Sequence, residues 1–444
     1  MSTSGPFGST PGEPDPDDPF GGMGFLFQDL SRLFSGGGGS WDTAAQLAGS
    51  IATEGRPEVN VDPVDRLAIE QLARVAELQV QEVTGLNIDE PVRLEALNRT
   101  QWARRFLDDE RPLLEELSDS IGIALQAQLG QVEDDLAEDP DALTGLAGLP
   151  GMSPEALIRQ VMSMMGPMLL GMMAGSTAGH LAVRAMGHFE LPLPRPEGEP
   201  LTMVLANVDS FAEEWSLPKD SIRLWVCLSD VAHAQILGIP HVRARITDLL
   251  GQYVSSFNSD PEDMERRMQE LGVPDLLGVG EPDMAALQRL ASDPDMLLGA
   301  MQSDQQRQVM PQLAALVAII EGYVDHVLDT IGGRLLPDYN RVTEALRRRR
   351  VEAGPQTRFV ERLFGLELSQ ATFDRGADFV DGVVERAGVD ALASLWTSLD
   401  SLPTPADLDA PGLWLARLDI ESTELTLDDA TFEVPDFLDL PDED

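Results

Sequence analysis

The sequence predicts a mainly α-helical protein with one small pair of strands and a disordered tail at each end. Apolar residues recur at helical spacing through most of the chain from Trp41 onward. The segments 189–194 and 201–206 are the only convincing extended ones, and a turn rich in Pro, Gly and Glu joins them. A helical domain carrying one short strand pair follows from these observations.

The two ends of the chain differ in composition from its middle. Residues 1–22 are mostly Gly, Pro, Ser and Asp, and residues 419–444 hold many acids and no base. We therefore expect a disordered segment over 1–40, a helical domain over 41–418 and a flexible acidic tail over 419–444.

The helices of the first half are predicted in chain order. Asp62-Pro63 opens a helix of roughly twenty residues, because Asp is a good N-cap and Pro fits the first helical turn. Further helices are expected at about 91–107 and 110–129, and 131–152 is expected to be a loop. The Met-rich stretch from Ser153 is broken by Gly and Pro, which favours a buried helix over a membrane span. Three glycines at intervals of four residues would let another backbone approach closely: Gly171, Gly175 and Gly179.

The second half is predicted to be helix after helix. The expected ranges are about 218–237, 240–256, 260–271, 282–292, 305–332, 337–350, 367–387 and 389–398.

Composition limits the classes of partner. The chain has 76 acidic and 31 basic residues and a formal charge of −45, so it should repel nucleic acid and anionic lipid. A peptide or protein partner is compatible with this charge, and the oligomeric state stays open. A single cysteine, Cys227, rules out an intramolecular disulfide. No basic or apolar leader precedes Arg32, so we expect a cytoplasmic location without membrane insertion.

Residues 229–233, Ser-Asp-Val-Ala-His, have the spacing of a zinc-peptidase helix that has lost half of its chemical groups. Such a helix needs H-E-x-x-H, with two His ligands one turn apart and a Glu between them as general base. His233 stands at the second ligand, Ser229 at the first and Asp230 at the base. Taken alone, a histidine on an apolar stripe is more often a core residue hydrogen-bonded to a neighbour.

A second helix supplies carboxylates. Glu321 shares an apolar stripe with its neighbours, so it points inward and must meet a cation, a metal or strong donors. Asp325 lies one turn on, on the same side, whereas His326 lies about 140° around the helix and faces elsewhere. We therefore predict that His233 and Glu321 lie close enough to share a metal or a hydrogen bond. The simpler alternative for Glu321 is an ion pair with an arginine.

Several segments, in this order, resemble the type 2 zincin-like metallopeptidase family, a group of actinobacterial predicted hydrolases. They start at Trp41-Asp-Thr-Ala, Trp102-Ala-Arg-Arg-Phe, Phe189-Glu-Leu-Pro-Leu-Pro, Leu228-Ser-Asp-Val-Ala-His, Glu321-Gly-Tyr-Val-Asp-His, Ala345-Leu-Arg-Arg-Arg-Arg, Phe364-Gly-Leu-Glu-Leu and Leu402-Pro-Thr-Pro. The resemblance implies a helical zincin-like fold with a metal between the 218–237 and 305–332 helices. It implies His233 and Glu321 as metal ligands, Asp230 in the place of the general base, and Asp325 behind the ligands. By its position on the helix, His326 is expected at the surface or in an outer layer of the site.

Two departures from the family pattern weaken the implied site. Serine is a poor zinc ligand, so Ser229 reduces the site from three protein ligands to two. Asp230 is one methylene shorter than Glu, and displacing a base by ~1 Å can cost ~10²-fold in rate.

Three hypotheses remain. In the favoured one the site is degenerate, with weak or absent zinc and weak or absent activity, and the protein acts by binding or as a structural component. In the second, an active zinc metallohydrolase recruits another ligand from His180, His188 or His326. In the third, the chain is an acidic, non-enzymatic interaction protein whose family pocket is merely core.

Overall fold

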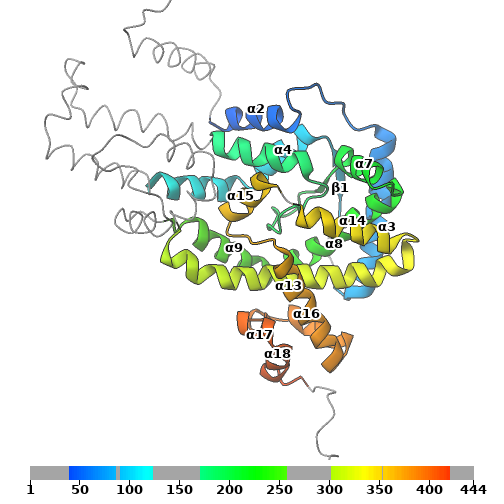
Figure 1. Ribbon diagram of the computed structural model, residues 1–444, viewed down its shortest axis with the longest axis vertical. Coiled ribbons are helices and arrows are strands. Elements are labelled where there is room, and N and C mark those ends of the chain that lie inside the picture. Colours follow the sequence, from blue (N-terminus) through cyan, green and yellow to red (C-terminus); the bar gives the residue numbers. More distant parts are fainter. Residues whose placement is uncertain (1–39, 87–90, 124–170, 258–301, 353, 421–444) are drawn as a thin grey trace, which may run out of the picture.

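The computed structural model describes residues 40–86, 91–123, 171–257, 302–352 and 354–420 (Figure 1). Within these ranges the chain is helical apart from one pair of short strands and the connecting segments, which confirms the predicted fold class. The predictions for both tails, for the 131–152 loop and for helices at 260–271 and 282–292 lie outside the described residues.

The first half begins with α2 (Ser40–Ala52) and α3 (Pro63–Thr84). The predicted start of α3 is confirmed: the Asp62 side chain accepts a hydrogen bond from the Val64 amide, and Pro63 is the first helical residue. Strand β1 (Leu94–Leu97) and helix α4 (Arg99–Asp109) follow. A capping box between Asn98 and Gln101 opens α4.

One strand of the predicted pair is confirmed, within 201–206, and its partner was predicted in the wrong place. β1 pairs in parallel with β2 (Leu201–Val204), with Leu94 opposite Leu201. The predicted 91–107 helix was therefore wrong at its start, and 189–194 is not a strand. Prolines at two positions of 189–194 have no amide to give to a ladder, and the amide of Phe189 bonds to a side chain of α8 (Lys219–Gly238). Helix α7 (Leu205–Glu214) starts directly after β2.

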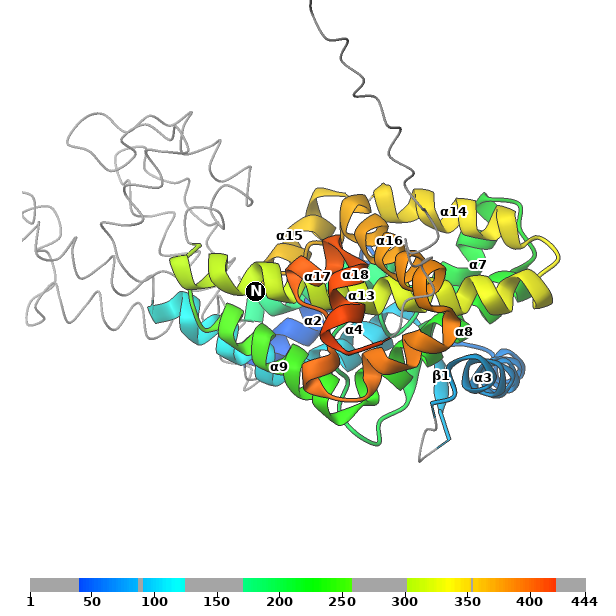
Figure 2. The same cartoon turned by 90° about the horizontal axis from the view of Figure 1, so that it is seen from below.

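Helix α13 (Asp304–Leu335) runs across the molecule and contacts α8 and α9 (Pro240–Val254) as well as the C-terminal helices (Figure 2). The predicted 305–332 helix lies within it. The C-terminal elements are α14 (Tyr339–Val351), α15 (Pro355–Leu363), α16 (Gln370–Ala387), η2 (Val389–Trp396), η3 (Leu399–Ser401), α17 (Pro405–Asp409) and α18 (Pro411–Arg417).

Glycines allow two close helix contacts. A Cβ on Gly175 would lie 2.6 Å from the carbonyl oxygen of Ala44, so the helix over 171–184 meets the backbone of α2. The close approach predicted from the glycine spacing is thereby confirmed. On the other side of the core, Gly322 of α13 lies against Gly376 of α16, and a side chain at either position would collide with backbone.

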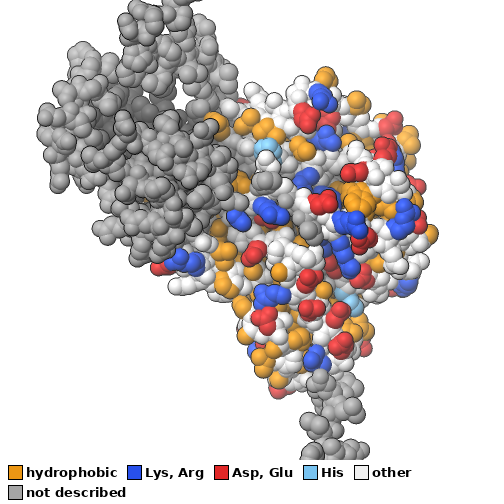
Figure 3. Space-filling model, in the orientation of Figure 1, with side chains coloured by type: hydrophobic (Ala, Val, Ile, Leu, Met, Phe, Trp, Pro, Cys, Tyr) orange, Lys and Arg blue, Asp and Glu red, His pale blue; other side chains and the backbone are white. Residues whose placement is uncertain are grey.

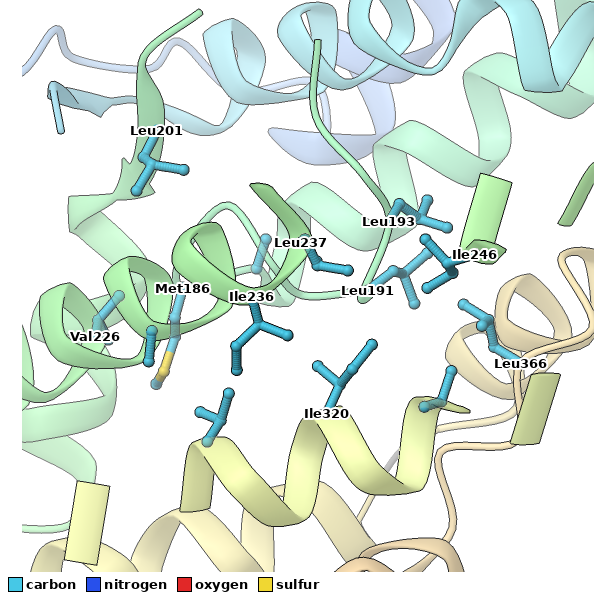
Figure 4. Close-up of a cluster of buried hydrophobic side chains, with 14 of the residues drawn as sticks. Met186, Leu191, Leu193, Leu201, Val226, Ile236, Leu237, Ile246, Ile320 and Leu366 are labelled. Atoms are coloured by element: carbon cyan, nitrogen blue, oxygen red, sulfur yellow. The ribbon is translucent and has the colours of Figure 1, made fainter. Parts of the chain in front are cut away.

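The core between α8 and α13 positions the site. Met186 and Leu191, which lie just before β2, meet Ile236 of α8 and Ile320 of α13 in one apolar cluster (Figure 4). Because this packing fixes both helices, polar residues on their facing sides are held against one another.

No single described helix is long and apolar enough to cross a membrane. Only the pair α8 and α9, bent by 89° at their junction, passes that test together, and only by length and composition.

Candidate functional site

His233 is the centre of the polar residues between α8 and α13. Its Nδ1 lies 2.9 Å from the carbonyl oxygen of Ser229, one turn earlier on α8. A carbonyl oxygen only accepts, so Nδ1 carries a hydrogen. Its Nε2 lies 3.2 Å from Oε1 of Glu321 on α13, which confirms the predicted proximity of these two residues.

The imidazole and the Glu321 carboxylate form a buried ion pair. Burial acts to lower the pKa of His233, but the Glu321 charge and hydrogen bond, with the Ser229 carbonyl, raise it above its ordinary value. Phe189 stacks on the imidazole with ring centroids 5.3 Å apart. His233 is therefore held from three sides, with both ring nitrogens engaged.

Asp230, in the place of the general base, is engaged with backbone. Its carboxylate accepts hydrogen bonds from the amides of His188 at 2.9 Å and Phe189 at 3.3 Å. Burial raises the pKa of Asp230 to about 7, although these two amides oppose the shift. A Cβ on Gly187 would overlap the carboxylate, so the absence of a side chain there lets the segment approach α8. Asp230 thus anchors residues 187–189 to α8.

Arg184 of the helix over 171–184 and two arginines of α14 bind Glu190, which follows this segment, and the second carboxylate of α13. Glu190 accepts from Arg184 Nε at 3.0 Å and from Arg349 Nη2 at 2.9 Å. Asp325, expected behind the metal ligands, accepts hydrogen bonds from both terminal nitrogens of Arg350, at 2.9 and 3.0 Å. The Arg350 guanidinium also lies 4.6 Å from the ring centroid of Phe373.

Sequence reasoning missed these partners, although a signal was present. The run Arg347–Arg350 reads as cations at a helix end, which complement the helix dipole. Buried carboxylates on a neighbouring helix need cations, and this requirement could have assigned the last two arginines inward.

The three alternative histidines lie elsewhere. His188 Nδ1 lies 3.2 Å from Oγ1 of Thr202, in a separate small pocket beside Trp102. Burial, together with the charges of Arg195 and Arg105, lowers the pKa of His188 to about 3. His326 is half-buried, and its pKa is lowered by burial against the opposing charges of Asp381 and Asp329. None of the histidines 180, 188 and 326 lines the pocket that contains His233.

That pocket lies between α8, α13 and α14 and encloses about 780 Å³, part of it open to solvent. Its polar lining includes Ser229, Asp230, His233, Glu321 and the three arginines 184, 349 and 350; its apolar lining includes Phe189, Trp225, Leu346 and Phe373. Acidic and basic side chains are likewise interspersed over the described surface seen in Figure 3.

The donor atoms suit two corners of a zinc tetrahedron but not a third. Two ligands ~2.1 Å from one tetrahedral zinc lie about 3.4 Å apart, near the 3.2 Å between His233 Nε2 and Glu321 Oε1. The other carboxylates of the pocket are held by amides or arginines. Among the described residues no three His, Cys, Asp or Glu side chains form a metal-binding group. The residues present therefore do not fit a three-ligand catalytic zinc.

Comparison with known proteins gives one family and one similar structure. The family model for zincin-like metallopeptidases matches residues 40–415. A crystal structure of a presumed hydrolase with a novel fold from Chloroflexus aurantiacus is similar, with a TM-score of 0.56 and 22% identity. The match covers 86% of this chain and 99% of that one. No curated protein matches the sequence. With the family model covering nearly all of the described residues, the chain belongs to the zincin-like metallopeptidase family.

Proposed function

We propose that this chain is a zincin-fold binding protein whose pocket takes up a peptide or protein segment without hydrolysing it. The observation that carries the proposal is the direct contact between His233 and Glu321, 3.2 Å apart, next to an Asp230 committed to two backbone amides. The groups that would hold a metal and activate water are bonded to one another or to the backbone.

Hydrolysis without a metal also lacks its parts. A Ser-His-acid arrangement needs one imidazole nitrogen facing the serine hydroxyl and the other facing the acid. In this pocket Nδ1 of His233 bonds to the backbone carbonyl of Ser229, and Nε2 bonds to Glu321. No imidazole nitrogen remains to take the proton of the Ser229 hydroxyl.

The lining of the pocket supports binding. Phe189, Trp225 and Phe373 offer apolar rings, while arginines and carboxylates alternate beside them. Apolar rings in a pocket can bury the apolar parts of a ligand, and placed polar groups orient its polar parts. A peptide has both kinds of group, and its neutral backbone suits a pocket that contains both signs of charge.

Metal analysis tests the first half of the proposal. Protein purified without a His tag should contain well under one zinc per chain, and isothermal titration with zinc should give weak binding. Ser229→His should raise the zinc affinity sharply, because a second imidazole one turn from His233 completes a three-ligand site. Ser221→His is the matched control, since Ser221 lies on the same helix with the same 9% exposure.

Turnover assays test the second half. The unaltered chain should cleave a mixture of fluorogenic peptides no faster than buffer. If it holds one tightly bound zinc, and cleaves peptides in a way that a chelator and Asp230→Ala both abolish, the binding proposal is wrong. An active metallohydrolase with a recruited ligand then takes its place.

A further inference from the structure

The outer face of α3 is apolar and has no described neighbour. Val64 is 76% exposed, Leu67 57%, Val75 43% and Leu78 66%. The opposite face of α3 packs against α8, α13 and β1 through Ile69, Ala73, Ala76 and Val80. Helix α3 lies at the edge of the molecule in both views (Figures 1 and 2).

These residues form one narrow line, which we call the α3 stripe: Val64, Leu67, Gln71, Val75 and Leu78. At about 100° per residue they span about 80° around the helix. The intervals along the stripe are three, four, four and three residues, so the spacing is the same read in either direction from Gln71. A stripe with this symmetry matches itself when a second copy lies antiparallel to it.

Apolar side chains would meet apolar side chains on both sides of the central Gln71 in such a pair. A two-fold axis beside Gln71 places Val64 opposite Leu78 of the second copy, and Leu67 opposite Val75. Contacts of this kind are isologous, since each residue pair occurs twice, and two-fold dimers are the commonest oligomers.

The charges beside the stripe are also complementary. Glu70 and Arg74 lie on the same flank of α3, and neither forms an ion pair with a described residue. Asp65 and Glu82 of the same helix pair with Arg223 and Arg334 of their own chain. The two-fold axis at Gln71 brings Glu70 of each copy beside Arg74 of the other, because antiparallel helices place the same flank on the same side.

We propose that two copies of this chain associate through the α3 stripe as an antiparallel, two-fold helix pair. A single helix pair buries at most roughly 1,000 Å², the lower limit for a specific interface, so we expect a dimer with a micromolar dissociation constant. The two acidic molecules also repel one another, so the association needs physiological or higher salt.

Sedimentation equilibrium of the full chain tests the proposal. The unaltered chain should pass from monomer to dimer as its concentration rises through the micromolar range. Leu67→Glu should leave a monomer at every concentration, with an unchanged circular dichroism spectrum because the residue is exposed. Leu413→Glu on α18 is the matched control, with the same 57% exposure, and should dimerise normally.

Charge exchange tests the orientation. Arg74→Glu alone should weaken the dimer several-fold, because two attractive pairs become repulsive. Adding Glu70→Arg to that variant should restore it, since the exchanged pair has the same complementarity. A double variant as weak as the single one contradicts the antiparallel arrangement.

A disulfide tests the register. Cys227 is buried, so Gln71→Cys adds one accessible thiol. Mild oxidation should link two Gln71→Cys chains, whereas Arg66→Cys, on another face of α3, should not be linked. An unaltered chain that stays monomeric at every concentration overturns the proposal, as it would if residues 1–39 covered the stripe. Association that Leu67→Glu leaves intact also overturns it.

Discussion

Helices α8 and α13 each place a buried carboxylate in the same pocket, and the two carboxylates have different partners. Glu321 of α13 meets a single imidazole, that of His233. Asp230 of α8 meets two backbone amides of the 187–189 segment. The contact between Glu321 and His233 of α8 has a spacing near that of two ligands of one zinc, whereas the carboxylate of Asp230 holds a segment of chain. The hydrogen-bond partners of a buried carboxylate, more than its residue type, decide whether it can react or only stabilises the structure.

The largest expected effect on stability comes from breaking the buried pair of His233 and Glu321. His233→Ala leaves the Glu321 carboxylate buried without a partner, and breaking a buried pair in this way costs about 3–5 kcal/mol. Urea unfolding should record this loss in the free energy of unfolding.

The half-buried His326 provides the control, because His326→Ala should cost about 1 kcal/mol or less. Replacing both members of the pair, His233→Leu with Glu321→Met, should recover much of the loss. If His233→Ala costs no more than the control, Glu321 does not depend on His233.

The next largest effect is the pH dependence of stability that Asp230 of α8 causes. The pKa of Asp230 is raised to about 7, mainly by burial, so the folded state keeps a proton that the unfolded state loses near pH 4. This contribution to stability is fully present below pH ~4 and is lost as pH rises through about 7. Between these limits stability falls by about 1.4 kcal/mol per pH unit for this one proton.

Thermal unfolding between pH 5 and pH 8, in the unaltered chain and in Asp230→Asn, isolates that proton. Burial also raises the pKa of Glu110 to about 8 and of Glu361 to about 7, and the raised pKa of His233 acts in the same direction. Those groups remain in the variant. The fall of stability with pH should therefore be less steep in the variant, by the amount that Asp230 contributes. Equal slopes would mean that Asp230 ionises in the folded state as it does in water.

A smaller effect is expected from the amides that Asp230 holds. Asp230→Asn keeps one acceptor and leaves one of the two amides without a partner, which costs about 1–2 kcal/mol at low pH. Hydrogen exchange should accelerate at the amides of His188 and Phe189 and stay unchanged at β2. Unchanged exchange at both amides would show that the carboxylate is not their acceptor in solution.

The smallest effect is expected at the partly exposed ion pair between Asp325 of α13 and Arg350 of α14. Arg350→Lys loses the two-pronged contact with Asp325 and the stacking on Phe373, but both charged side chains are at least 20% exposed. Such a pair contributes less than about 1 kcal/mol. Zinc affinity and the contact of His233 with Glu321 should not change; a large shift in either would place Asp325 inside the metal site.

Much of the helical architecture could be predicted from local signals. The cap at Asp62 and the apolar periodicity of α8 and α13 are properties of short stretches of chain. The strand pair could not be assigned in this way, since β1 and β2 are far apart in sequence and each is four residues long. Segments of four residues suit a strand or a helix equally, and only the partner decides between them.

The candidate site divides in the same way. Its central contact followed from the sequence, because a polar residue on an apolar helix stripe must find a partner, and His233 and Glu321 both needed one. The roles of these residues toward a metal remain a proposal. The hydrogen bonds from backbone amides to Asp230 could not be predicted, because every residue except proline has an amide and the sequence does not show which ones come near. Only the glycine at position 187 hinted that something approaches there.

By itself, therefore, the sequence determined most of the long helices, which of their faces are buried and which polar residues on those faces must be satisfied. These properties depend on neighbours within a few residues. The tertiary structure alone decided the partner of each group. Arg350 pairs with Asp325, two backbone amides bond to Asp230, and β1 pairs with β2. Each of those choices joins residues far apart in the chain, and the packing of the whole core selects among many equally suitable partners.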